Sequence, residues 1–463
     1  MSCTELILTP LRPATPIEGG IVDLLIRLQA PDLPGPVGHP VNPADGRDAI
    51  GTVTPPARLK LRLALVIDRS GSMMGEPLAE AVRCAQQLIA RLQADDEVAV
   101  VLYDGSVEVP IPLQSVAGVS AAAAALTQLR SGGQTALHAG WQAGLAQLGG
   151  GQPDAISRVL LLSDGQANIG PSTLDAFAPD LLAALERGLS TTTVGLGSGF
   201  NEELMIGLAR LGGGQSYYGQ TADDLADPFN EEFALLQALC VRQPRLHLTP
   251  GAGVQWEPLG DLHANLQTGT LALPDLAFGA EAWAMVRLHL APATAPETDR
   301  RHLLTVRASG IPASADVMLA TQPVRLDLPG LPAAMVDALP PDPLVQTRRT
   351  ETLFSTALAA VHAALRLGHP TAITQALAEA ATLADGQPWL LAKLAGIRDL
   401  ITRDLEMATK EVRYSSRKIS ARLAAKESSW DDFHTSTASL SVTGEGEGEV
   451  PAFLRKKVSE GRG

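Results

Sequence analysis

The middle of the chain alternates between short apolar runs and amphipathic helical patterns, from residue 61 to residue 240. The run LRLALVI at 61–67 precedes apolar residues spaced at i, i+3 and i+4, and a second apolar run, ISRVLLLS, lies at 156–163. Buried strands that alternate with helices pack as a doubly wound, mostly parallel sheet. We therefore expect an α/β domain over 61–240, in which ligands bind beyond the carboxyl ends of the strands.

The segments on either side of this domain have a different period. Residues 1–60 contain two strand-like runs, and residues 241–329 alternate apolar and polar side chains between Gly and Pro turns. This pattern is typical of an antiparallel β-sandwich. Because the N-terminal strands need a sheet to join, we expect 1–60 and 241–329 to form one sandwich into which the α/β domain is inserted.

The C-terminal part is expected to be helical and then disordered. Residues 342–413 show helical spacing and predict a hairpin or small bundle. Residues 414–463 are polar and predict a disordered tail, which contains the apolar and basic run VPAFLRKK at 450–457. That run is a candidate docking peptide, and a solvated tail with a chance apolar cluster is the alternative.

The net charge and the hydropathy of the chain limit the partners and the cellular location that we expect. The 463 residues carry a net charge of −14, from 36 Lys+Arg and 50 Asp+Glu, and no basic stripe stands out. We therefore expect no nucleic-acid partner. No run approaches about 18 uninterrupted apolar residues, the N-terminus lacks a signal-peptide pattern, and the three cysteines show no CxxC spacing. These features predict a cytoplasmic protein without a membrane contact.

Three loops at the predicted carboxyl edge of the sheet carry oxygen-bearing side chains. One loop follows the strand at 61–67, the second leads into the helix predicted from Thr135, and the third follows the strand at 156–163. Carboxylates with hydroxyls suit an octahedral Mg²⁺ (or Mn²⁺) at about 2.1 Å. For any one loop alone, an ordinary helix N-cap is the competing interpretation. The candidate metal ligands are Asp68, Ser70, Ser72, Thr135 and Asp164.

The segments DRSGSM, GGQTALHAG and LLLSDG, in this order, resemble the von Willebrand factor A (VWA) domain and its metal-ion-dependent adhesion site, DxSxS…T…D. All five positions of that motif are filled, and the chain is most similar to the intracellular bacterial type. The resemblance implies a bound Mg²⁺ or Mn²⁺ and a protein partner that presents Asp or Glu to the metal. The resemblance also implies that the protein acts together with MoxR-type AAA+ ATPases, or with kinases and phosphatases in stress and defence systems.

The leading hypothesis is therefore a metal-dependent protein-interaction module, an adaptor or regulator that is not an enzyme. One alternative is a metal-dependent phosphohydrolase, but Ser70 stands where such an enzyme needs a second acid after Asp68. The other alternative is a scaffold whose site is only structural. His138, three residues after Thr135, is expected on the helix surface or at the rim of the site, not as a catalytic base.

Overall fold

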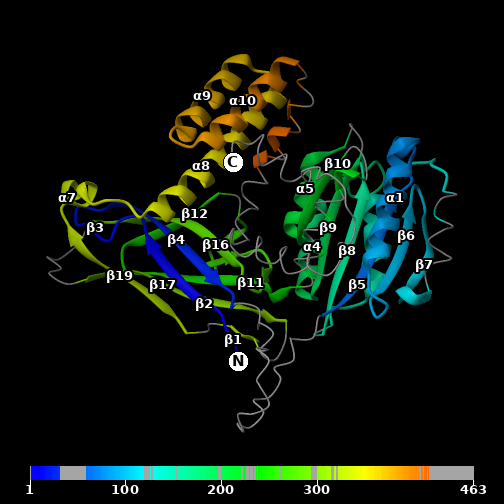
Figure 1. Ribbon diagram of the computed structural model, residues 1–463, viewed down its shortest axis with the longest axis horizontal. Helices are drawn as coiled ribbons and strands as arrows, with labels where there is room; N and C mark the ends of the chain where they lie inside the picture. The colour runs from blue at the N-terminus through cyan, green and yellow to red at the C-terminus, as the bar shows by residue number, and fades with distance from the viewer. Residues whose placement is uncertain are drawn as a thin grey trace, which may run out of the picture. The chain divides into compact units, whose positions relative to one another are not determined.

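The protein is described from a computed structural model, which divides into two compact units, Ala57–Ala238 and Met1–Pro56 with Leu239–Gly463 (Figure 1). Of the tail expected to be disordered over 414–463, Ser415 and Ser416 are described; they are helical and buried, so the prediction was wrong for these two residues, and the rest, with its VPAFLRKK run, lies outside the described residues. The structure describes residues 2–31, 59–118, 129–152, 154–196, 200–219, 238–260, 262–292, 300–313 and 322–403, with short pieces at 126, 223–225, 229, 233, 236, 317–319, 405, 408–409, 411–413 and 415–416.

The first unit contains a six-stranded sheet in the order β10-β9-β8-β5-β6-β7. All neighbouring strands are parallel except β6 and β7, so the predicted mostly parallel sheet is confirmed. The antiparallel edge strand β7 is not anticipated by the sequence analysis, because Pro110 and Pro112 interrupt its pattern; proline is tolerated at a sheet edge. The strands are β5 (Lys60–Asp68), β6 (Glu97–Tyr103), β7 (Val107–Ser115), β8 (Ala155–Ser163), β9 (Leu189–Leu196) and β10 (Gly213–Gly219).

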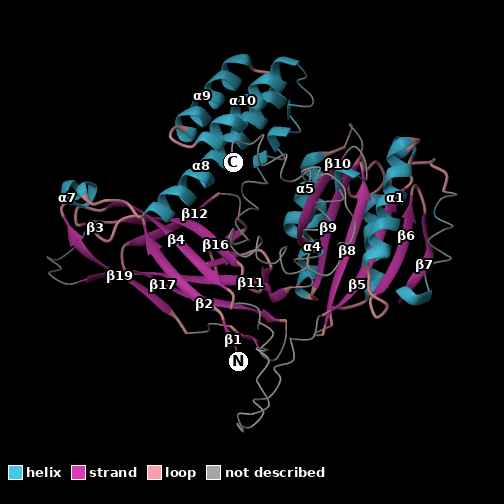
Figure 2. Ribbon diagram, viewed as in Figure 1, coloured by secondary structure: helices cyan, strands magenta, loops and turns pink. Residues whose placement is uncertain are grey.

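Helices α1 (Glu76–Arg91), α3 (Leu137–Leu148), α4 (Leu174–Glu186) and α5 (Glu202–Leu211) pack against this sheet (Figures 1 and 2). Helix α3 lies especially close to the strands. A Cβ at Gly140 would meet Tyr103 Cδ1 at 2.4 Å, and one at Gly144 would meet Val66 Cγ2 at 2.5 Å. The two glycines thus bring the start of α3, and the loop before it, against β5 and β6.

The second unit holds two larger sheets, which are antiparallel except for one parallel strand pair at the edge of the larger one. The four-stranded sheet, in the order β12-β16-β4-β2, joins N-terminal strands to strands more than 200 residues away in the sequence. The additional antiparallel sheets expected on either side of the α/β domain are therefore present. The four strands are β2 (Glu5–Pro10), β4 (Gly20–Gln29), β12 (Val254–Leu259) and β16 (Glu281–Leu290).

The larger sheet has the order β13-β14-β11-β17-β19-β3, with β15 also paired to β11. A further short pair joins β1 (Ser2–Cys3) to β18 (Val317–Met318). The strands of the larger sheet are β3 (Thr15–Pro16), β11 (Leu239–Pro250), β13 (Ala264–Asn265), β14 (Thr270–Ala272), β15 (Leu276–Ala277), β17 (Arg300–Pro312) and β19 (Val324–Leu331).

The C-terminal helices predicted from the sequence are also present, and Figure 2 shows them as a group. Helix α8 is capped by Asp342, whose Oδ1 accepts the Val345 N–H at 3.0 Å, and ends at Gly368 in the left-handed conformation. No helix among the described residues is both long and apolar enough to cross a bilayer. The helices of this group are α8 (Pro343–Leu367), α9 (Pro370–Ala384) and α10 (Pro388–Arg403). The short helix α7 (Ala333–Ala338), which the sequence analysis did not predict, lies apart from them and contacts β3 (Figure 2).

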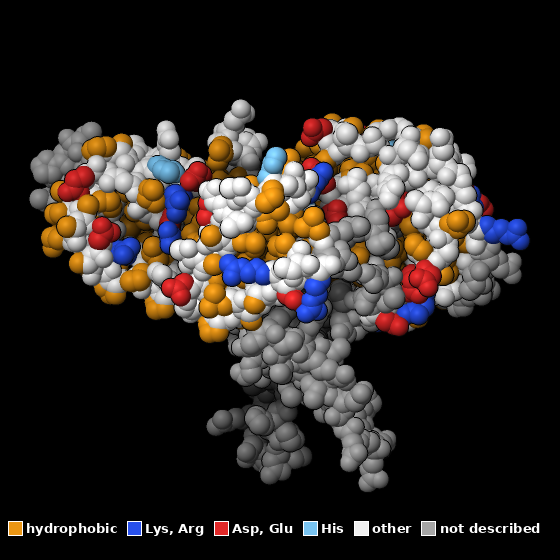
Figure 3. Space-filling view, turned by 90° about the horizontal axis from the view of Figure 1, so that it is seen from above, with side chains coloured by type: hydrophobic (Ala, Val, Ile, Leu, Met, Phe, Trp, Pro, Cys, Tyr) orange, Lys and Arg blue, Asp and Glu red, His pale blue; other side chains and the backbone are white. Residues whose placement is uncertain are grey.

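A buried ion cluster fixes the start of α8 to the four-stranded sheet. Asp23 on β4 is 4% exposed and accepts hydrogen bonds from Arg287 Nε at 2.8 Å and Arg287 Nη2 at 3.0 Å. Arg349 of α8 donates to the same carboxylate. Figure 3 shows one face of the molecule, on which Lys, Arg, Asp and Glu side chains are scattered among hydrophobic ones.

Candidate metal centre

The first loop of the candidate site begins at the end of β5. Asp68 is fully buried, and its Oδ1 accepts the Ser70 N–H at 2.9 Å. Ser70 Oγ and Ser72 Oγ lie 3.2 Å apart. A short 3₁₀ turn, η1 (Gly71–Met73), holds this arrangement, because Met73 is buried in the core below it. The loop thus presents one carboxylate and two hydroxyls together.

The third loop, after β8, is bonded directly to the first. Ser163 donates from Oγ to Asp68 Oδ2 at 2.6 Å and accepts the Gly165 N–H at 2.8 Å. Asp164 is 5% exposed, and its Oδ1 accepts the Gln166 N–H at 3.1 Å. The two candidate acids are close enough for the charge of Asp164 to act on Asp68.

The second loop is tied to the other two by main-chain hydrogen bonds. Gly71 N–H donates to Gly133 O at 3.2 Å, which joins it to the first loop. The N–H of Thr135, a residue that is 2% exposed, donates to Asn168 Oδ1 at 2.7 Å, which joins it to the third. All five candidate ligands therefore lie on three interconnected loops at one edge of the sheet.

The helix-cap interpretation does not hold for this site. Helix α3 begins at Leu137, not at Thr135 as predicted, and its N-cap is Ala136, which has no side chain to donate or accept. Ser70 precedes η1 but makes no side-chain capping bond. The hydroxyls of Thr135 and Ser70 are therefore not explained by capping.

The electrostatics favour a cation between the two acids. Burial raises the pKa of Asp68, hydrogen bonds from Ser163 and Ser70 oppose this rise, and the negative charge of Asp164 adds to it. Arg69, next in sequence, turns instead to Asp104 at 3.1 Å and Glu108 at 3.0 Å. Among the described residues, no ion pair includes Asp68 or Asp164. Two buried carboxylates that lack a basic partner match a divalent ion.

Tyr103 is a component that the sequence analysis missed. It is the last residue of β6, fully buried, and its hydroxyl donates to Asp68 Oδ2 at 3.0 Å. Complete burial, and then the negative charge of Asp68, raise the pKa of Tyr103 well above its usual value, so it stays a neutral donor. The only signal in the sequence was its place at the end of the strand next to β5.

The donor set is unusual in containing few acids. No group of three or more His, Cys, Asp or Glu in the described part of the chain is arranged to hold a metal. A metal at this site would therefore depend on the hydroxyls of Ser70, Ser72 and Thr135 in addition to two carboxylates. Mg²⁺ and Mn²⁺ accept neutral oxygens and retain water, so the residues present fit such an ion.

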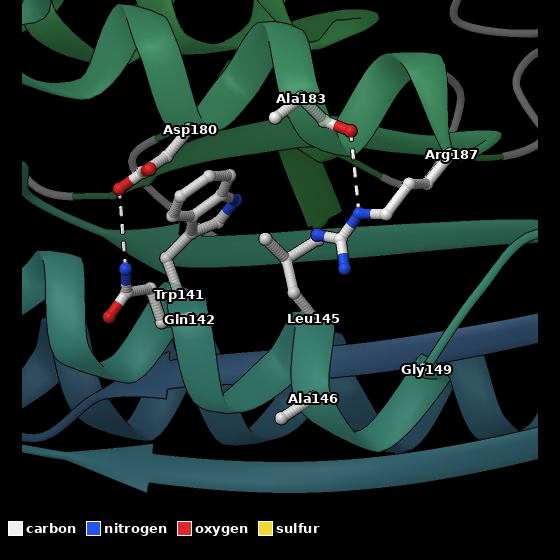
Figure 4. A pocket seen from close by; sticks show the side chains of 8 residues that line it. All are labelled: Trp141, Gln142, Leu145, Ala146, Gly149, Asp180, Ala183 and Arg187. Carbon is white, nitrogen blue, oxygen red and sulfur yellow. Dashed lines mark hydrogen bonds between the residues drawn. The ribbon is translucent and has the colours of Figure 1, made fainter.

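His138 is engaged away from these loops. Its Nε2 lies 2.8 Å from Asp180 Oδ2, and its ring packs edge-on against Phe177 at 4.8 Å. A groove of about 270 Å³ lies next to it between α3 and α4. Figure 4 shows that Gln142 of α3 bonds to Asp180 of α4 beside the Trp141 side chain. The side chain of His138 is only 14% exposed and packs between these helices, so the predicted position on the helix surface or at the rim of the site was wrong.

Residues 63–231 match the family model of the von Willebrand factor type A domain. These residues therefore form a VWA domain. The chain is 31% identical over 176 residues to the uncharacterized protein sll0103 of Synechocystis sp., covering 38% of this chain and 41% of that protein. It is 28% identical over 173 residues to the uncharacterized protein YfbK of Escherichia coli, covering 37% of this chain and 30% of that protein. The matched region thus spans less than half of either relative.

Similarity to solved structures extends beyond the VWA domain. A von Willebrand factor type A protein from Catenulispora acidiphila has a TM-score of 0.64 at 14% identity, over 89% of this chain and 96% of that one. The ArnB paralog VWA2 from Sulfolobus acidocaldarius has a TM-score of 0.56 at 16% identity, over 89% of this chain and 98% of that one. At these identities the similarity shows the fold alone, and it covers most of the chain.

Proposed function

We propose that this VWA domain binds Mg²⁺ or Mn²⁺ and uses the ion to bind an Asp or Glu side chain of a protein partner. The observation that supports this most strongly is the pair of buried acids, Asp68 and Asp164, whose charge no basic side chain among the described residues balances. VWA domains are generally protein-interaction modules, which agrees with this proposal. The ion, when bound, supplies positive charge and a coordination position for an incoming carboxylate.

The hydrogen bonds suggest how the ligand roles divide. Both oxygens of Asp68 already accept bonds, Oδ1 from Ser70 and Oδ2 from Tyr103 and Ser163. Asp68 would therefore act through water, while the hydroxyls of Ser70, Ser72 and Thr135 would bind directly. Asp164 would bind through water or directly, since the Gln166 N–H occupies its Oδ1 only.

The same geometry argues against a phosphohydrolase. A carboxylate that attacks phosphorus must be accessible, but Asp68 has no exposed surface and is held by three neutral donors. We therefore propose a role as a non-enzymatic adaptor or regulator. Its cellular setting, in the cytoplasm with a MoxR-type ATPase, a kinase or a phosphatase of a stress or defence system, is part of this proposal and rests on the sequence resemblance.

Affinity capture from native cells tests the proposal. The tagged full chain is used in Mg²⁺ and in EDTA, beside Asp68→Ala and the control Asp180→Asn, which changes an acid on α4 away from the three loops. A partner should be recovered with the wild type and the control in Mg²⁺ only, and not with Asp68→Ala. Equal recovery under all conditions would exclude metal-dependent binding.

A further inference from the structure

One face of the seven-stranded sheet is rich in arginine, although the chain as a whole has a net charge of −14. Along β11, β17 and β19 the side chains alternate between buried apolar residues such as Leu248, Val306 and Leu326 and a polar opposite face. The exposed arginines on that polar face, which we call the arginine face, are Arg245, Arg300, Arg307 and Arg325.

Strand register places these side chains next to one another. His247 pairs with Arg307, and Thr305 pairs with Arg325, so Arg307 lies diagonally between Arg245 on β11 and Arg325 on β19. Diagonal neighbours on one face of a sheet are about 7–8 Å apart. The arginines thus form a row that crosses three strands.

The positive charge of this row is largely uncompensated. Partial burial, and then the charges of Arg307 and Arg245, lower the pKa of His247. Among the described outward-facing positions of β11, β17 and β19, Asp327 alone is acidic, and it is already bonded to His302 at 2.7 Å and Arg325 at 3.4 Å. Such a face attracts an anionic ligand.

A hollow of about 530 Å³ lies beside the row, at its β19 end. Arg300, Arg325 and Asp327 form the charged part of its wall, and β2 and β19 supply apolar surface through residues such as Leu8, Pro10 and Pro329. A ligand with an acidic segment followed by an apolar one would therefore match the row and the hollow together.

We propose that the chain's own segment 444–453, GEGEGEVPAF, binds the arginine face, with Glu445, Glu447 and Glu449 on the arginines and the apolar residues in the hollow. In an extended chain these glutamates, two residues apart, point to the same side at about 6.6–6.8 Å intervals. Arginine forks match carboxylates, and the intervening glycines add no bulk.

Both the reach of the chain and the chemistry of the face support this occupant. The 29 peptide links from Ser416, the last described residue, to Glu445 can span up to about 95–105 Å when extended. Nucleic acid is a poorer fit, because the described outward positions of β11, β17 and β19 carry no Phe, Tyr or Trp on which bases could stack. The segment belongs to the same chain and needs no other molecule.

The test measures the fluorescence anisotropy of a labelled peptide of residues 441–454, in EDTA so that the result is independent of the metal centre. The protein used is the full chain with Glu445→Gln, Glu447→Gln and Glu449→Gln, so that its own tail does not occupy the arginine face. Adding Arg245→Gln, Arg307→Gln and Arg325→Gln should weaken binding by about tenfold or more. The matched control, with Arg187→Gln, Arg366→Gln and Arg403→Gln on exposed helix ends, should bind as before.

The wild-type tail should compete with the peptide. Its effective concentration is on the order of millimolar, so the wild type should bind the peptide several-fold more weakly than the glutamine variant. Equal binding to the face and control variants would overturn the proposal. Equal binding to the wild type and the glutamine variant would overturn the tail as occupant, as would tighter, face-dependent binding of a DNA duplex.

Discussion

Two buried aspartates in this protein have opposite surroundings. Asp23 in the four-stranded sheet is bonded to two arginines, from β16 and α8. Asp68 in the VWA domain is bonded to the Ser70 N–H and two hydroxyls, with a second acid nearby. Burial alone would raise the pKa of both. The arginines outweigh burial at Asp23 and leave its pKa below the ordinary value, whereas the pKa of Asp68 is raised.

Under the proposed function, this difference separates an acid with a structural role from an acid of a metal site. The charge of Asp23 is satisfied within the fold, and its partners connect a helix to a sheet. No basic group among the described residues balances the charge of Asp68. A bound cation would neutralise this buried negative charge. The predictions below test that contrast, from the largest expected effect to the smallest.

Breaking the structural cluster should have the largest effect. Arg287→Ala leaves Asp23 buried with one partner fewer, which should cost about 3–5 kcal/mol of unfolding free energy. Urea unfolding of the second unit, followed by tryptophan fluorescence, measures this loss. Arg325→Ala is the control, because Arg325 is 62% exposed and its ion pair should contribute less than about 1 kcal/mol. Similar losses in the two variants would show that burial does not strengthen the Asp23 cluster.

Removing the charge of Asp68 should stabilise the metal-free protein, whereas substitutions of buried polar residues usually destabilise a protein. Without metal, Asp68→Asn should unfold at a higher temperature than the wild type, because it removes an uncompensated buried charge. With free Mg²⁺ at 100 times its dissociation constant, the wild type should gain about 2.7 kcal/mol and the variant nothing. Calorimetry in EDTA and in Mg²⁺ measures both. A magnesium-dependent shift that persists in Asp68→Asn would contradict the assignment.

The hydroxyl of Tyr103 should matter for metal affinity. Tyr103→Phe removes a donor that orients Asp68, and loss of such outer-shell contacts weakens metal binding by about tenfold or more. Competition against a fluorescent Mg²⁺ indicator measures the affinity. Trp141→Phe is the control, since it loses a buried bond to Thr191 in the same core but none to the three loops. If both variants weaken binding alike, the effect reflects core packing.

As the pH falls, the contributions of Asp23 and Asp68 to the unfolding free energy should change in opposite directions. These changes should be smaller than the effects described above. The pKa of Asp23 is lowered, so its advantage over Asp23→Asn is complete above the ordinary value of 3.8 and is lost as pH falls through the folded-state pKa. The pKa of Asp68 is raised, so the metal-free wild type should approach Asp68→Asn in stability as pH falls through that raised pKa. Unfolding free energies between pH 7 and 3 in EDTA measure both trends, and parallel trends would contradict the contrast.

The sequence was informative where the signal is local. The strand–loop order places Asp68, Ser70, Ser72 and Asp164 at one edge, because the parallel strands β5 and β8 end on the same side of the sheet. The loop of Thr135 follows the antiparallel β7, so the sequence placed Thr135 there only through the family resemblance. The sequence could not reveal the pairing of Asp23 with Arg349, which are 326 residues apart and meet only through the packing of α8. Nor did it reveal Tyr103, which reads as an ordinary apolar strand residue, or β7, whose prolines conceal an edge strand.

Isothermal titration of the full chain with Mn²⁺ and Mg²⁺ tests the central claim most directly. We expect one divalent ion per chain in the wild type, and none at this site in Asp68→Asn or in Asp164→Asn. Absence of heat in the wild type, or an unchanged stoichiometry in both variants, would contradict the claim that these two acids form a cation site.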